Sequence, residues 1–225
     1  MRHGLTLFAL LTAACGSPLA MAHEEPPTEA FAQHRFEIWL GVSHMPGLDD
    51  LEPLDGDFDS TGFGLGGAWH VPVKRFENSD LLLGIDGYLG VTDSSLSGYI
   101  GDVSLYHVYL GGSAKWAFGE RRNIYLDAGV GYHGVDITEL DDDYLYGDEH
   151  EAWSDSAGGA FVGASWDIGA QRAHETAGLT VGFKVHFVDF GRVYDEDTYI
   201  GPILGDDAGD LDGPIYVLQI GYGGR

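Results

Sequence analysis

Residues 178–190 read GLTVGFKVHFVDF, and this stretch decides the fold class. Its odd positions from Leu179 to Phe187 are all apolar, whereas Lys184 and His186 lie among the even positions. Strict alternation with a period of two predicts a β-strand with one apolar and one polar face. The stretch is longer than the roughly five or six residues usual in soluble sheets, and it matches the roughly 9–11 residues that a tilted strand needs to cross a bilayer.

The same alternation occurs in seven further stretches. The predicted strands cover residues 35–43, 61–73, 81–92, 103–118, 123–133, 157–168, 178–190 and 214–222. Connections after the second, fourth and sixth strands are short, while the others are longer, with residues 134–156 and 191–213 expected as the largest loops. Long loops therefore gather at one end of the array. The pattern predicts an all-β fold, an eight-stranded antiparallel up-and-down transmembrane β-barrel formed by residues 33–225.

The charges separate a membrane barrel from a soluble one. The apolar strand faces carry no Asp, Glu, Lys or Arg, and a basic residue there would cost about 2–4 kcal/mol at the middle of a bilayer. Aromatic residues such as Trp69 and Tyr222 lie toward strand ends, where interfacial girdles form. The opposite faces carry charged residues, which we expect to form an interior polar network. Its predicted members are Glu37, Asp86, Lys115, Asp127, Asp167, Lys184 and His186, with His70, His107 and His133 on the same side.

This interior has two interpretations. An eight-stranded barrel is just wide enough to be filled by its own side chains, which favours a polar plug of paired and hydrogen-bonded charges. Alternatively, acids outnumber bases and histidine titrates near neutrality, which would suit a narrow conduit for cations or a proton-sensitive gate.

The N-terminus reads as an export signal. Residues 1–22 combine a short basic start, an apolar stretch at residues 5–14 and a small-residue cleavage site ending at Ala22. Residues 23–32 would then form a lead-in to the barrel. Cys15 is the only cysteine, and its lipidation is the alternative to removal with the signal. No later apolar run approaches the length of a transmembrane helix.

The net charge of −25 excludes a nucleic-acid-binding surface. Most acids lie in the long loops, where divalent cations could bind loosely and bridge to lipopolysaccharide; a solvated, mutually repelling surface is the alternative. The candidate metal ligands are Asp55, Asp57, Asp59, Asp141, Asp142 and Asp143. The first three begin like a calcium loop, but Ser60 stands where that loop needs glycine and Gly66 where it needs glutamate. No other cofactor is expected.

The last strand places Tyr216, Leu218, Ile220 and Tyr222 on one face. Together with the eight-strand pattern, it resembles the small eight-stranded outer-membrane barrels of Gram-negative bacteria, the OmpA-transmembrane, OmpX and OmpW-like group. The resemblance implies a place in the bacterial outer membrane, with lipid and lipopolysaccharide as partners. It also implies recognition by the barrel assembly machinery, which reads a terminal aromatic residue; here residues 223–225 extend beyond that position.

Enzymes among such barrels use Ser/His/acid or Asp/His sites at the outer rim. Ser104 and His107 share a strand but are expected on opposite faces, and Ser113 with His133 is only a geometric possibility. No Gly-x-Ser-x-Gly, His-Glu-x-x-His or glycine-rich phosphate loop occurs. We therefore predict a non-enzymatic protein with a structural or interaction role at the cell surface. The alternatives are a porin-like channel for cations or small solutes and, third, a lipid A-modifying enzyme.

Overall fold

The computed structural model describes residues 34–49, 59–95, 101–119, 122–141, 149–168, 178–193 and 209–224. The predicted signal peptide (1–22), including Cys15, and the lead-in (23–32) lie outside these residues. Within these described ranges, no helix is both long enough and apolar enough to span a membrane.

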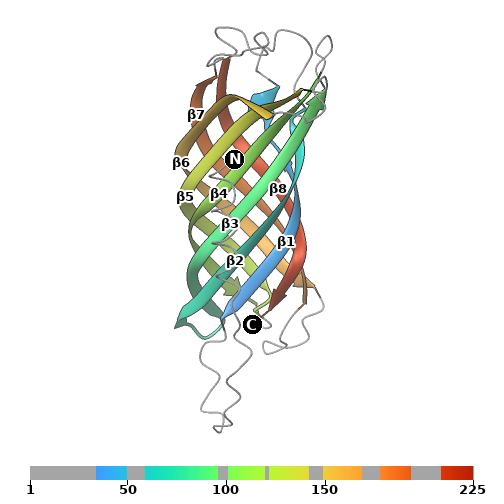
Figure 1. Cartoon of the computed structure of the whole chain (residues 1–225). Coiled ribbons are helices and arrows are strands. Elements are labelled where there is room, and N and C mark those ends of the chain that lie inside the picture. Colours follow the sequence, from blue (N-terminus) through green and yellow to red (C-terminus); the bar gives the residue numbers. More distant parts are fainter. Residues whose placement is uncertain are drawn as a thin grey trace, which may run out of the picture. The chain divides into compact units, whose positions relative to one another are not determined.

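Eight antiparallel strands form one closed barrel, in which each strand pairs with its neighbours in sequence and β8 pairs with β1 (Figure 1). The strands are β1 (Arg35–His44), β2 (Thr61–Arg75), β3 (Ser79–Ser95), β4 (Gly101–Phe118), β5 (Ile124–Asp141), β6 (Glu149–Ile168), β7 (Gly178–Val193) and β8 (Gly209–Gly224). A short 3-10 helix, η1 (Pro46–Leu48), follows β1. The predicted eight-stranded up-and-down barrel is confirmed. We call the end where β1 begins and β8 ends the short-turn end, and the opposite end the long-loop end. The lower part of the barrel lies toward the short-turn end, and the upper part lies toward the long-loop end.

Seven of the eight strands extend further toward the long-loop end than predicted, by up to eight residues in β5 and β6. β5 continues to Asp141 and β6 begins at Glu149, so most of the expected loop 134–156 is paired strand. β7 and β8 likewise occupy both ends of the expected loop 191–213. The prediction was wrong there because these extensions lie beyond the apolar outer face, so that the pattern used to recognise the strands no longer marks them.

The outward side chains of the lower and middle strands form a continuous apolar belt. Leu126 is 54% exposed, Ile85 49% and Phe183 43%. The belt consists mainly of Phe36, Ile38, Leu40, Val42, Phe63, Leu65, Trp69, Leu83, Ile85, Leu89, Leu110, Trp116, Ile124, Leu126, Val130, Tyr132, Val162, Trp166, Leu179, Phe183, Phe187, Leu218, Ile220 and Tyr222. Exposed apolar area on this scale far exceeds what a water-soluble monomer tolerates, and identifies the surface of a membrane barrel.

Toward the long-loop end the polarity of the wall reverses. The inward side chains there form the upper apolar core, which comprises Met45, Leu48, Val103, Leu105, Val135, Ile137, Trp153, Phe190, Val193, Leu211 and Ile215. Side chains exposed at the same level are polar and include Asp155, Ser156, Asp189, Arg192, Asp210 and Asp212. The polar interior expected from the sequence therefore describes only the lower and middle barrel, while the upper part is built like a soluble protein.

Candidate functional site: the barrel interior

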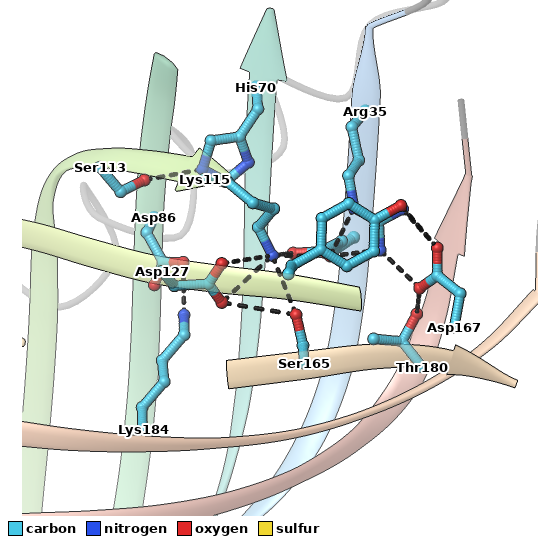
Figure 2. A network of polar contacts seen from close by, with 12 residues as sticks. Arg35, His70, Asp86, Ser113, Lys115, Asp127, Ser165, Asp167, Thr180 and Lys184 are labelled. Carbon is cyan, nitrogen blue, oxygen red and sulfur yellow. Dashed lines mark hydrogen bonds and ion pairs between the residues drawn. The ribbon is translucent and has the colours of Figure 1, made fainter. Parts of the chain in front are cut away.

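Arg35 is the centre of an ionic network near the short-turn end, although its side chain is only 1% exposed (Figure 2). Its guanidinium donates two hydrogen bonds of 2.7 Å to Asp167 and one of 2.7 Å to Glu37. It also donates to the Tyr125 hydroxyl at 2.9 Å and lies 4.1 Å from the centre of that ring. The hydroxyls of Tyr125 and Thr180 donate to Asp167 in turn, at 2.9 and 2.8 Å. Bidentate pairing of this kind is the strongest geometry available to an arginine–carboxylate pair.

Lys115 extends the network to the neighbouring carboxylates. Its Nζ lies 2.8 Å from Glu37 Oε2 and 3.3 Å from Asp127 Oδ2, and it donates to Ser165 Oγ at 3.4 Å. The register of β4 and β5 places Lys115 directly opposite Asp127, so this contact follows from the strand pairing. Glu37 is thus shared by Lys115 and Arg35, and the contacts of these two bases join β1, β4, β5 and β6 across the lumen.

A second ion pair crosses the middle of the barrel. Lys184 on β7 donates to Asp86 Oδ2 on β3, and both side chains are buried. The Lys184 ammonium also lies 4.8 Å from the centre of the Phe161 ring and 5.2 Å from that of Trp39. Cation–π contacts of this kind contribute roughly 0.5–2 kcal/mol each, more when desolvated.

The charged side chains of the network comprise three bases, Arg35, Lys115 and Lys184, and four acids, Glu37, Asp86, Asp127 and Asp167. Each of these has at least one ion-pair partner in the part of the chain that the structure describes. Pairing offsets the desolvation that makes an isolated buried charge so costly. The arrangement can hold the wall together across the lumen, and it leaves an excess of one acid.

Three histidines and their aromatic neighbours lie between this network and the upper apolar core. His107 and His133 stack with ring centroids 5.3 Å apart, and a 3.0 Å hydrogen bond joins Nε2 of the first to Nδ1 of the second. His186 packs against His133, Tyr109 and Phe161. Both ring nitrogens of His186 lack a hydrogen-bond partner among the described residues. His186 was predicted as a member of the interior polar network, but it packs in an aromatic cluster and makes no ionic contact among the described residues.

Sequence reasoning missed Arg35, Tyr125, Ser165 and Thr180 as members of the network. A signal for Arg35 existed, because it lies two residues before Glu37 and so shares its strand face. However, Arg35 is the first residue of β1, and a basic residue at that position is equally typical of the end of a strand outside the barrel interior. The same spacing places Tyr125 on the face of Asp127 and Ser165 on that of Asp167, but a strand face alone does not state which side chain across the lumen a hydroxyl contacts.

The serine–histidine pairs considered from the sequence are not formed. Ser113 hydrogen-bonds to His70 at 2.8 Å, inside the barrel, and not to His133. Ser104 donates instead to Asp93, at 2.7 Å. His70 Nδ1 has no partner among the described residues, so that pair lacks the third group that orients a catalytic histidine.

Most of the predicted metal ligands lie outside the described residues, namely Asp55, Asp57, Asp142 and Asp143. The backbone of Asp141 ends β5, and its side chain is not described. Asp59 accepts a 3.0 Å hydrogen bond from the Thr61 amide. Across the described ranges, no group of three or more His, Cys, Asp or Glu residues could hold a metal ion. Loosely bound divalent cations at the loops stay a prediction.

The fold and this interior define a class: an eight-stranded transmembrane β-barrel whose lower lumen holds a buried ionic network. No protein-family model matches the chain, and no curated protein matches its sequence.

Solved structures similar to the chain include three outer-membrane or surface proteins. Neisserial surface protein A, from Neisseria, is 13% identical, with 86% of this chain and 98% of that chain covered and a TM-score of 0.47. Ail, the attachment invasion locus protein of Yersinia pestis, is 11% identical, with coverage of 86% and 98% and a TM-score of 0.44. The outer membrane protein OprG from Pseudomonas aeruginosa is 12% identical, with coverage of 86% and 97% and a TM-score of 0.40. Similarity at this level is one of overall fold alone.

Proposed function

We propose that the chain is a bacterial outer-membrane barrel with a structural or interaction role at the cell surface, and that its lumen is closed to solutes. The observation that carries this proposal is that the interior is occupied at successive levels. Buried ion pairs fill the lower lumen, and the upper apolar core fills the other end. An ion that crossed would have to displace paired charges and then pass through an apolar layer, where a charge is poorly tolerated.

The apolar belt supports the membrane location. Placed in hydrocarbon, its side chains leave water, and the closed sheet leaves no unpaired strand edge at the level of the belt. In this arrangement the acidic long-loop end faces the exterior, and lipid and lipopolysaccharide surround the belt. β8 would be the segment recognised by the barrel assembly machinery, because Tyr222 lies near its end with its ring on the lipid side.

Conductance separates this proposal from the alternatives. Membrane fractionation and a heat-shifted gel band would first establish a folded outer-membrane barrel. The purified protein in planar bilayers is then expected to give no discrete conductance steps, with a known porin as the positive control. Discrete steps would overturn the closed lumen and favour a small channel.

The channel is the second candidate function because the network contains one more acid than bases. A lumen with that excess would prefer cations, so reversal potentials in asymmetric KCl would identify it. The protein is not proposed as an enzyme, because the one Ser–His contact among the described residues, between Ser113 and His70, is buried within the barrel and lies away from the outer rim.

A further inference from the structure

The barrel wall is split between β6 and β7 at the long-loop end. The ladder between these strands pairs Ala160–Ile168 with Leu179–Phe187 and stops there, within the part of the chain that is described. Both strands continue upward on their other sides, β6 along β5 as far as Glu149 and β7 along β8 as far as Val193. The two strands lie at the left of the wall in Figure 1. We call residues 155–159 of β6 and 188–191 of β7 the β6–β7 split.

On the β6 edge of the split, a side chain and not a strand satisfies a backbone amide: the Ser156 amide donates to the Asp155 carboxylate at 2.6 Å. On β7 the ladder with β8 shifts register between Asp189 and Arg192, and there the Gly191 amide donates to the Asp189 carboxylate at 2.9 Å. Asp155, Ser156 and Gly158 are exposed on the β6 edge. A side chain that caps its own neighbour's amide protects a free strand edge from pairing, but it also marks a place where another strand could pair.

The split does not open into the lumen. A Cβ on Gly159 would lie 2.8 Å from the His133 Nε2 atom, so the imidazole lies directly behind the β6 edge. Val188 and Phe190 are buried, and Phe190 belongs to the upper apolar core. The split is therefore a feature of the outer surface and not a portal into the lumen.

Charge indicates what such an edge would accept. Between Gly134 and Gly159 the sequence has nine acids and no Lys or Arg. Between Val188 and Gly213 it has eight acids and a single base, Arg192. Of these acids, Asp155 and Asp189 lie on the split itself and are exposed, so they attract a basic strand and not an acidic or neutral one.

We propose that the β6–β7 split binds an extended Lys/Arg-rich segment of a partner protein by strand addition to β6. The peptide carbonyl groups replace the carboxylate at the Ser156 amide, and the peptide cations pair with the released Asp155 and with Asp189. Main-chain hydrogen bonds supply the affinity of such strand addition, and the side chains supply the specificity. The inference rests on the proposed function, because the split must face the cell exterior to meet a partner.

The test uses the full-length folded barrel in lipid nanodiscs and fluorescence anisotropy. The probe is a labelled eight-residue peptide of alternating Lys and Val, compared with the same peptide N-methylated on alternate amides and with a Glu/Val peptide. The basic peptide is expected to bind, and the other two are expected to lose binding. Raising the salt concentration should weaken the complex, since the charges involved are exposed.

The matched variants are D155N/D189N at the split and D49N, an exposed acid at the same end of the barrel. The double variant should weaken peptide binding about three- to tenfold, the effect of losing two exposed charge pairs, while D49N should leave it unchanged. Equal binding of the methylated peptide would overturn strand addition, and an equal loss in D49N would overturn the location. Self-association of the barrel through this edge, detected by sedimentation, would also overturn it. Conductance steps would contradict only the closed lumen.

Discussion

Replacing Lys184 by methionine should destabilise the barrel strongly, whereas removing its partner as well should restore most of the lost stability. Lys184 and Asp86 are both buried, and among the described residues each forms an ion pair only with the other. Methionine keeps the length of the side chain but leaves the Asp86 carboxylate buried without a cation.

The expected size follows from that uncompensated charge. Removing one partner of a buried pair costs about 3–5 kcal/mol, which here includes the cation–π contacts with Trp39 and Phe161. In the double variant D86L/K184M no charge is left, and replacement of a buried pair by apolar side chains is neutral or even stabilising by about 1–4 kcal/mol. We therefore expect the double variant to lie within about 1 kcal/mol of the unaltered protein or above it.

Guanidinium unfolding in detergent micelles, followed by the fluorescence of the five tryptophans, measures these differences. With a slope of about 4 kcal/mol per M, the single variant should lower the midpoint by roughly 1 M. K74M is the control, because Lys74 is exposed at the short-turn end, and a change there should stay within about 0.5 kcal/mol. A K184M midpoint equal to that of K74M would refute the buried pair, and so would a double variant as unstable as the single one.

Two further predictions concern the outer surface and the wall. I85R places a base in the middle of the apolar belt and should lower the free energy of unfolding in phospholipid vesicles by about 2–4 kcal/mol. T61R, at an exposed position at the long-loop end of β2, should lower it by less than about 1 kcal/mol. Equal effects would contradict the proposed position of the membrane. G66A should lower the free energy of unfolding by about 1–3 kcal/mol, because its methyl group would overlap the Trp39 ring. In the control G134A the added methyl group meets nothing within 4 Å and should not destabilise the barrel. If G66A were as stable as the unaltered protein, Trp39 would have room to move.

Much of the fold was predictable from the sequence because the side-chain period of a strand is two. Alternation sorted each strand into two faces, and the position of Asp127 and Lys184 inside the barrel and of Phe183 outside it follows from that sorting. Pairing between strands that are neighbours in sequence gives the up-and-down order, and pairing of β8 with β1 closes the ring.

The hub of the network was not predictable in the same way. Arg35 and Asp167 are 132 residues apart, and they meet only because closure brings β1 and β6 to face each other across the lumen. Periodicity states which face a residue occupies, but not which residue lies opposite it in the barrel. The upper extensions of β5 and β6 were missed for another reason. There the apolar residues, such as Val135 and Ile137, lie on the inner face of the strand and no longer on its outer face.

The reversal of polarity along the wall also fixes how deep the protein sits. Sliding the barrel inward by one or two residues would draw Asp189 and Asp155 into hydrocarbon, which is energetically costly for each carboxylate. Sliding it outward would leave Phe187 and Tyr132 in water. These opposing penalties fix the depth of the barrel in the membrane, so the side chains of the wall set the height at which the long-loop end projects from the bilayer.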